Sequence, residues 1–173
     1  MTAIRPARID ELDILLGIVR STIRQMESQG IFQWDDVYPD RATLQKDIEK
    51  RHMQVIENRG EVAGMVAIND EQSPEYQEVP WQYSEPALVI HRLIIDPAQQ
   101  RKKLASQLMD FAELAAADAK CESIRLDVFV WNPSAITFYK KRGYRQAGTV
   151  YFRKGPFLCC EKHIAKISPS FRH

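Results

Sequence analysis

The chain has 173 residues, 45% hydrophobic and 27% charged, a balance that predicts one soluble domain over residues 1–173 with its core within about 4–164. A formal net charge of +1 excludes a surface that binds nucleic acid as a whole, and no apolar run is long enough for a membrane span or signal peptide. Three cysteines, two of them adjacent, make a disulfide framework improbable, so we expect a reduced, cytoplasmic protein.

The N-terminal third predicts a strand followed by two helices. Ile4–Ala7 has the pattern of a short edge strand. Asp10 is a candidate N-cap for a helix whose apolar residues keep a helical spacing until it ends near Gly30. Asp40 is a candidate N-cap for a second helix.

The period then changes to that of strands. Residues 53–57 and 62–68 predict a hairpin around Asn58-Arg59-Gly60. Residues 69–86 contain three prolines and predict a long exposed connection, a kind of segment that often carries function. Residues 87–95 are nearly all apolar and predict a buried central strand.

The C-terminal half alternates helices and strands. A helix is expected from near Gln100 to about Lys120, a strand at 123–129, and a short helix at 132–141 that Gly143 closes. Two further strands follow at 145–152 and 157–164, joined around Gly155-Pro156. The order predicts an α/β layered fold with a mixed sheet, in which residues 87–129 form a right-handed parallel crossover.

A cationic turn follows the central strand. The strand ends at Asp96-Pro97, and Arg101, Lys102 and Lys103 come at the expected start of the next helix. A helix N-terminus presents unpaired backbone N–H groups and the positive end of the dipole, which favours a bound phosphate. A solvated basic turn explains the same residues equally well.

The short helix near residue 135 carries a second pattern. Ala135, Phe138 and Tyr139 share one helical face, which should turn toward the sheet. The Tyr139 hydroxyl would then lie near the ends of the two preceding strands, where ligands of open α/β sheets bind. An isolated tyrosine in such a place is more often an ordinary packed aromatic.

Together these segments resemble the GNAT superfamily of acetyl-CoA-dependent acetyltransferases. Its cofactor loop has the pattern Gln/Arg-x-x-Gly-x-Gly/Ala, and here the matching residues are Gln100-Arg101-Lys102-Lys103-Leu104-Ala105. The later family motif is met in full by Asn132, Ala135, Tyr139, Gly143 and Tyr144. The resemblance runs from Ile4 to about Ile164, and it departs from the family at Lys103, where glycine is usual.

The resemblance implies a mostly antiparallel sheet flanked by helices, with one parallel β-α-β crossover that carries the cofactor loop. It implies direct transfer of an acetyl group from acetyl-CoA to a primary amine. The implied cofactor-binding residues are Leu93, Ile95, Gln100, Arg101, Lys102, Lys103, Leu104, Ala105, Ser106, Asn132 and Tyr139.

The resemblance also suggests catalytic and acceptor groups. Tyr139 would protonate the leaving thiolate, and Glu85, His91 or a water molecule would act as the base. Trp34 and Tyr38 would line the acceptor site. Alternatively, these aromatic side chains are buried and only fix the position of their loop. No metal spacing is present, nucleic-acid and membrane partners are not expected, and a homodimer is left open.

Two other functions fit parts of the sequence. A GNAT-fold module that binds acyl-CoA without turnover would explain Lys103 and the lack of an evident base. An anion-binding or nucleic-acid-binding domain would use the cations at 101–103 and 140–142, but the near-zero net charge and the lack of a base-reading motif oppose it. The acceptor itself, whether a small amine, an antibiotic, an amino acid or a protein amine, is not encoded in any recognisable motif.

Overall fold

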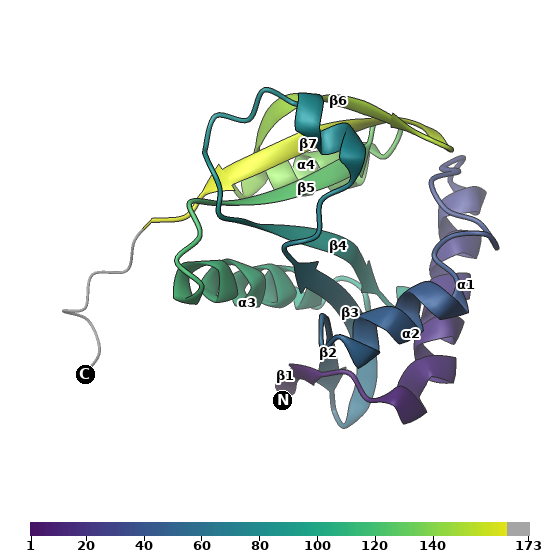
Figure 1. The fold of residues 1–173 in the computed structure, drawn as a ribbon. Coiled ribbons are helices and arrows are strands. Elements are labelled where there is room, and N and C mark those ends of the chain that lie inside the picture. Colours follow the sequence, from purple (N-terminus) through teal and green to yellow (C-terminus); the bar gives the residue numbers. More distant parts are fainter. Residues whose placement is uncertain (166–173) are drawn as a thin grey trace. The chain divides into compact units, whose positions relative to one another are not determined.

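A computed structural model describes residues 1–165, so residues 166–173 of the predicted domain lie outside the described part. Within residues 1–165, seven strands form a mixed sheet in the order β1-β2-β3-β4-β5-β7-β6, together with four α-helices (Figure 1). The chain divides into two compact units, Met1–Asn69 with Ile90–Phe111 and Asp70–Val89 with Ala112–His173.

The first unit contains the N-terminal strands and helices. Its complete elements are β1 (Thr2–Pro6), the 3-10 turn η1 (Ile9–Glu11), α1 (Leu12–Ser28), α2 (Arg41–Glu49), β2 (Met53–Asn58), β3 (Glu61–Asn69) and the 3-10 turn η3 (Pro97–Gln99). β2 pairs antiparallel with both β1 and β3, which confirms the predicted hairpin. The unit also takes the C-terminal part of β4 (Ala87–Ile95) and the N-terminal part of α3 (Leu104–Asp118).

The core of this unit follows from the apolar stripe of α1. That helix packs against α2 and β3. Leu15 and Leu44, one on each helix, are fully buried, as are Val55 and Met65 on the two hairpin strands. The Asp40 side chain accepts a hydrogen bond from the Thr43 backbone N–H at 2.9 Å, as predicted for the N-cap of α2.

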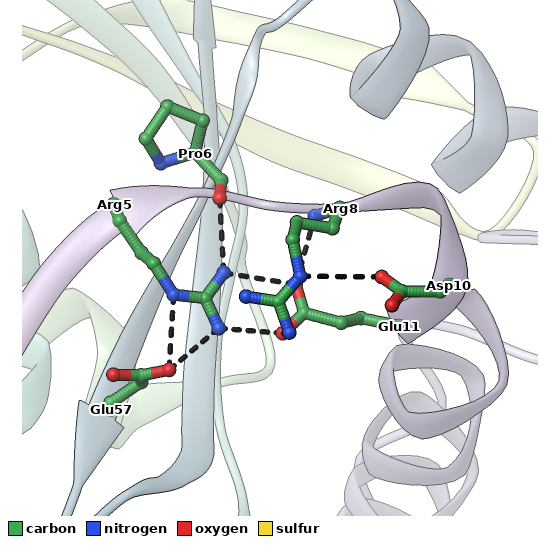
Figure 2. Close-up of polar contacts among 6 residues, drawn as sticks. All are labelled: Arg5, Pro6, Arg8, Asp10, Glu11 and Glu57. Atoms are coloured by element: carbon green, nitrogen blue, oxygen red, sulfur yellow. Dashed lines mark hydrogen bonds and ion pairs between the residues drawn. The ribbon is translucent and has the colours of Figure 1, made fainter.

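The predicted N-cap at Asp10 is wrong, because Asp10 lies inside η1 and its side chain is exposed. The residue at the N-cap position of α1 is Glu11, whose carboxylate caps η1 and not α1: it accepts a hydrogen bond from the Arg8 backbone N–H at 2.8 Å. The same carboxylate receives the Arg5 guanidinium at 2.6 and 3.0 Å, and Arg5 also binds Glu57 on β2 (Figure 2). Glu11 therefore ties the start of α1 to β1, and a purely local cap pattern could not reveal this.

The second unit is built on β5. Its complete elements are the 3-10 turn η2 (Pro74–Glu78), β5 (Ser123–Phe129), α4 (Pro133–Lys141), β6 (Arg145–Phe152) and β7 (Gly155–His163). β4 pairs parallel with β5 from Ala87 to Val89, which confirms the predicted parallel crossover. β7 pairs antiparallel with both β5 and β6. Gly155 and Pro156 lie inside β7, so the hairpin turns at 153–154 and not where it was predicted.

The connection Asp70–Pro86, here called the strap, runs across β5 and β7 (Figure 1). The prediction that it is exposed is wrong for its middle, because Tyr76 and Val79 are buried. The Tyr76 hydroxyl donates to Asp127 on β5, and the Gln82 backbone N–H donates to the buried carboxylate of Glu161 on β7. Polar composition hides this because the buried residues are few and irregularly spaced.

Candidate functional site

The cationic turn lies between η3 and α3 in the first unit. α3 begins at Leu104, four residues later than predicted, because Arg101 and Lys103 have φ values of +65° and +58°. These left-handed residues cannot belong to a right-handed helix. The side chains of Arg101, Lys102 and Lys103 are all exposed.

The backbone of this turn suits an anion. Left-handed residues in a loop turn successive N–H groups toward a common side and make a concavity that binds anions. The first turn of α3, which contains Leu104, Ala105 and Ser106, adds N–H groups that have no acceptor within the helix. The turn therefore combines three exposed cations with helix N–H groups that have no acceptor in the helix, a combination that favours a bound phosphate.

Amide side chains anchor the turn to the rest of its unit. Gln100 and Gln25 on α1 exchange two hydrogen bonds of 2.9 and 3.1 Å. Gln99 accepts from Asn58 at 3.0 Å and from the Lys102 ammonium at 2.6 Å. Sequence analysis missed the contacts of Gln100 with Gln25 and of Gln99 with Asn58, because they join residues far apart in the chain.

β4 is irregular just before the turn. Arg92 has φ +52° in the middle of the strand, and residues 91–93 are all half-buried instead of alternating between the two faces. The left-handed residue interrupts the regular strand just before the backbone at Leu93 and Ile95. On β3, Gly64 leaves room for this backbone, since a Cβ there would lie 2.7 Å from the Ile94 carbonyl oxygen.

Arg92 is held by a buried carboxylate. Its Nε and Nη2 lie 2.7 and 2.6 Å from Asp47 on α2, and both side chains are almost fully buried. Its Nη1 donates to the Tyr38 hydroxyl at 2.7 Å. The irregular middle of β4 is thus connected to the predicted acceptor loop through one guanidinium.

The two predicted acceptor-loop aromatics differ in exposure. Trp34 is half-buried and packs against the core of the first unit, as the packing interpretation expects. Tyr38 is 40% exposed, so its ring is available to a ligand. Asp35 accepts hydrogen bonds from the backbone N–H groups of Val37 and Tyr38, which shapes this loop.

The two predicted bases lie in different units. In the first, His91 Nε2 lies 2.9 Å from the side-chain oxygen of Asn69, whose amide nitrogen lies 3.2 Å from His52 Nδ1. In the second, the Glu85 side chain is 67% exposed and binds Gln72 at 2.8 Å. The Glu85 carboxylate and the His91 imidazole therefore each already have a hydrogen-bond partner.

Tyr139 lies on α4 in the second unit. Asn132 caps this helix by accepting a hydrogen bond from the Ala135 backbone N–H at 3.2 Å, and Gly143 ends it with φ +89°. The Tyr139 ring contacts Phe138 and Tyr144 edge-on. Burial raises the pKa of Tyr139 well above its ordinary value, and the negative charge of Asp127 raises it further. The hydroxyl therefore remains a proton donor at neutral pH.

Asp127 is a polar group that sequence analysis did not select. It interrupts an otherwise largely buried strand, and its carboxylate accepts a hydrogen bond of 2.6 Å from Tyr76 of the strap. Arg125, two residues earlier, is buried and carries Trp81 over its guanidinium at 4.5 Å. Two charged residues in an apolar strand were the available signal.

A family model described as the acetyltransferase (GNAT) family matches residues 20–144. This match spans well over half of the chain. The chain belongs to the GNAT acetyltransferase family. The predicted resemblance and its implied fold, with one parallel strand pair in a mixed sheet, are confirmed.

Solved GNAT structures share this architecture. An acetyltransferase of the GNAT family from Streptococcus agalactiae is 24% identical, with a TM-score of 0.80 and coverage of 95% of this chain and 96% of that chain. The PaiA N-acetyltransferase from Thermoplasma acidophilum, solved in complex with coenzyme A, is 16% identical, with a TM-score of 0.72 and coverage of 94% and 99%. The ribosomal-protein-S18-alanine N-acetyltransferase from Escherichia coli is 13% identical, with a TM-score of 0.70 over the whole of both chains. No curated protein matches the sequence significantly.

The cysteines of this GNAT chain do not resemble nucleophiles. Cys121, Cys159 and Cys160 are free and buried. Burial raises the pKa of Cys159 to about 12 and that of Cys160 to about 11, so both remain thiols. Among the described residues, no group of three or more His, Cys, Asp or Glu could hold a metal, and no helix is long and apolar enough to cross a membrane.

Proposed function

We propose that this GNAT acetyltransferase moves the acetyl group of acetyl-CoA directly to a primary amine. The observation that carries the proposal is the turn at 101–103, which combines two left-handed residues, three exposed cations and a helix N-terminus. The coenzyme A bound in the Thermoplasma acidophilum relative supports the choice of cosubstrate. The bound cosubstrate would supply a thioester carbonyl for the amine to attack.

The cofactor site would use the residues that the family pattern selects. The backbone near Leu93 and Ile95 would pair with the pantetheine arm, and the N–H groups of Leu104–Ser106 would receive the pyrophosphate. Arg101 and Lys102 would neutralise phosphate charge. Gln100 and Asn132 would act indirectly, because the structure uses their side chains to fix the turn and to cap α4.

Lys103 is compatible with this role. Glycine at the family position lets the backbone approach the pyrophosphate closely. In this chain Lys103 has a left-handed φ of +58°, a conformation that glycine adopts readily. The exposed ammonium can therefore lie beside the phosphates without changing the backbone. The left-handed backbone at Lys103 favours a working cofactor loop over the alternative of a weak, non-catalytic binding module.

Tyr139 would protonate the thiolate of coenzyme A as it leaves. Burial keeps its hydroxyl protonated. The acceptor would lie against the exposed ring of Tyr38, with Trp34 behind the loop. We infer a cytoplasmic location, where three free cysteines remain reduced.

A thiol-release assay with acetyl-CoA tests the proposal. The amine panel contains spermidine, an aminoglycoside, free amino acids, and a peptide that begins with alanine, since one structural relative acetylates a protein alanine. We expect thiol release with at least one amine and thermal stabilisation by coenzyme A. Stabilisation without release on any amine would instead indicate a binding module. The absence of both thiol release and stabilisation would overturn the family-based proposal.

A further inference from the structure

The Tyr38 hydroxyl accepts a hydrogen bond and still has a proton to donate. Arg92 Nη1 donates to the Tyr38 oxygen at 2.7 Å. A guanidinium has N–H donors and no acceptor, so the hydroxyl proton cannot be directed back to Arg92. Within residues 1–165, no other protein group accepts this proton, and Tyr38 is 40% exposed. The hydroxyl therefore presents its proton to solvent or to a ligand of the acceptor loop.

The Arg92 guanidinium that binds this hydroxyl is itself fixed. Its Nε and Nη2 lie 2.7 and 2.6 Å from the same oxygen of Asp47, and both side chains are almost fully buried. Two contacts to one carboxylate fix the plane of the guanidinium, and with it the direction of Nη1. A hydrogen bond from a cation also polarises the hydroxyl that accepts it, which makes that hydroxyl a stronger donor.

The backbone of Tyr38 is held as well. Asp35 Oδ1 accepts hydrogen bonds from the backbone N–H groups of Val37 and Tyr38 at 3.1 and 3.3 Å. The Asp35 backbone N–H donates to the Tyr38 carbonyl oxygen at 3.1 Å. Tyr38 is therefore held both at its backbone and at its side-chain oxygen. A donor fixed in this way loses little conformational freedom when it binds a ligand.

The charge of the acceptor loop limits what that ligand can be. Residues 30–40 contain three aspartates and no lysine or arginine. The nearby Arg92 does not offset this charge, because Asp47 already balances its guanidinium. The loop therefore attracts an ammonium group and opposes a carboxylate. The ligand oxygen that receives the Tyr38 proton should accordingly be neutral, as in the carbonyl of an amide.

These groups belong to the first unit, which also holds the proposed cofactor turn. Arg92 directly precedes Leu93, whose backbone would pair with the pantetheine arm. Gln25, near the end of the helix that leads into the acceptor loop, binds Gln100 at the start of the turn. The Tyr38 hydroxyl thus lies one side chain away from the strand that would bind the cosubstrate, within a single unit.

We propose that Tyr38 determines specificity by donating its hydroxyl proton to a carbonyl oxygen of the acceptor, and that Arg92 is a positioning residue that orients this hydroxyl. The substrate class is an α-amino amide, in which a neutral carbonyl is attached to the carbon that bears the amine. Amino acid amides and peptide N-termini both have this chemistry, and spermidine has no carbonyl. The inference rests on the proposed function and names the class of acceptor for it.

Two matched amines isolate the contribution of the carbonyl. Alaninamide and isopropylamine share a methyl-bearing carbon that carries the amine, and only alaninamide has a carbonyl on that carbon. Tyr38→Phe is compared with the parent for each probe separately, so the different protonation of the two amines cancels. We expect the variant to lower kcat/KM about tenfold for alaninamide, the size of one good hydrogen bond, and less than about twofold for isopropylamine.

Two further variants separate orientation of the hydroxyl from a structural effect. Arg92→Lys keeps a cation beside Asp47 and removes the Nη1 donor, so it should lower the ratio of the alaninamide rate to the isopropylamine rate as Tyr38→Phe does. A purely structural loss would reduce both rates and leave this ratio unchanged. Tyr151→Phe is the matched control, since that tyrosine is 74% exposed on β6 in the second unit, and it should keep the parent ratio.

A folding check and a peptide complete the design. Thermal stabilisation by coenzyme A should be retained in Tyr38→Phe, and this variant decides alone if Arg92→Lys does not fold. The alanine-initiated peptide separates the two sources of an α-amino amide. A higher kcat/KM than for alaninamide indicates a protein N-terminus, and an equal or lower value indicates an amino acid amide.

The outcomes distinguish this inference from the proposed function. Equal effects of Tyr38→Phe on the two probes, or less than about a threefold loss on alaninamide, would overturn the role of Tyr38 alone. Thiol release with spermidine, an aminoglycoside or free alanine that exceeds the release with both alaninamide and the peptide would overturn the substrate class alone. The absence of thiol release with every amine would overturn the proposed function and this inference together.

Discussion

The Arg92 guanidinium on β4 holds the Asp47 carboxylate on α2, with both side chains almost fully buried. Removing one member of such a pair leaves a buried charge without compensation. We expect Asp47→Ala to lower the free energy of unfolding by about 3–5 kcal/mol, as measured by urea denaturation.

A surface ion pair of the same type provides the control. Asp13 binds Arg41, but their side chains are 83% and 57% exposed. Asp13→Ala should change the unfolding free energy by less than about 1 kcal/mol. If Asp47→Ala and Asp13→Ala lose similar unfolding free energy, burial does not increase the contribution of the Arg92–Asp47 pair to stability.

Replacing Lys103 by glycine should stabilise the protein. Lysine at φ +58° carries a steric cost of about 1–2 kcal/mol that glycine does not, although glycine loses about 0.5–1 kcal/mol through the entropy of the unfolded chain. The expected net gain is a few tenths to about 1 kcal/mol. Lys102→Gly, at a neighbouring position outside the left-handed region, should give no gain.

The same Lys103→Gly variant reports on the cofactor loop. Because the turn keeps its backbone, coenzyme A affinity should equal or exceed that of the parent in calorimetric titration. A loss of about tenfold or more, equivalent to about 1.4 kcal/mol, would show that the ammonium binds a phosphate directly.

Glu11 should make stability depend on acid pH. Hydrogen bonds from Arg5 hold the pKa of Glu11 below its ordinary 4.5, even though burial acts in the opposite direction. A lowered folded-state pKa stabilises the protein above the unfolded-state value, and this contribution is lost as pH falls through the folded-state value. Glu11→Gln should therefore be less stable than the parent at neutral pH, and the difference should narrow below about pH 4.5.

Urea denaturation from neutral pH down to about pH 3 measures this convergence. Asp10→Asn is the control, since its side chain is 74% exposed and should contribute less than about 0.5 kcal/mol at neutral pH. Parallel stability curves for the parent and Glu11→Gln would contradict the assigned role of the Arg5 contact.

Elements with a strong apolar period were predictable, and left-handed turns were not. The nine residues Ala87–Ile95 form β4 with the predicted bounds, as expected for a short, nearly continuous apolar run in a buried strand. Gln100–Lys103 have good helix propensity, yet left-handed φ values at Arg101 and Lys103 exclude them from α3. Glycine is the residue type that most often indicates a left-handed backbone in a sequence, and this chain has lysine at position 103.

Candidate site residues could be selected from the sequence where they lie close together in the chain, but not where packing brings them together. Tyr139 lies on α4 and Asn132 caps that helix, so one motif selected both as candidates. Asp127 and Tyr76 are 51 positions apart, and no periodicity relates a strand residue to one residue of an irregular strap. The contact of Arg92 with Tyr38 was hidden for the same reason.

Charge reversal in the turn should weaken the binding of acetyl-CoA. Arg101→Glu combined with Lys102→Glu replaces two exposed cations near the proposed phosphate site with anions. We expect a higher KM for acetyl-CoA and a weaker dependence of that KM on ionic strength, because the screened attraction has been removed. Steady-state kinetics at several salt concentrations measure both.

The pair Lys140→Glu and Lys141→Glu makes the same change in net charge on α4, outside the proposed cofactor residues. Its effect on the acetyl-CoA KM should be smaller than that of the pair in the turn. Equal effects would mean that the overall field of the protein, and not the turn, attracts the cosubstrate.

Tyr139→Phe should retain the packed ring and remove only the proton donor. Loss of a general acid costs about 10²–10⁴-fold in rate, and a thiolate leaves fairly easily, so a fall in kcat near 10² is expected. KM for acetyl-CoA should stay nearly constant, because the ring contacts with Phe138 and Tyr144 remain. Pre-steady-state thiol release identifies the chemical step as the one that slows.

The pH profile gives an independent check on Tyr139. Burial and the charge of Asp127 raise its pKa above the ordinary 10, so the protonated form persists to higher pH than in a free tyrosine. In the wild type, kcat should therefore not decline between about pH 8 and pH 9.5 through loss of this proton. If kcat of Tyr139→Phe stays within about threefold of the parent value, Tyr139 only lines the site. The thiolate would then leave unassisted or take its proton from water.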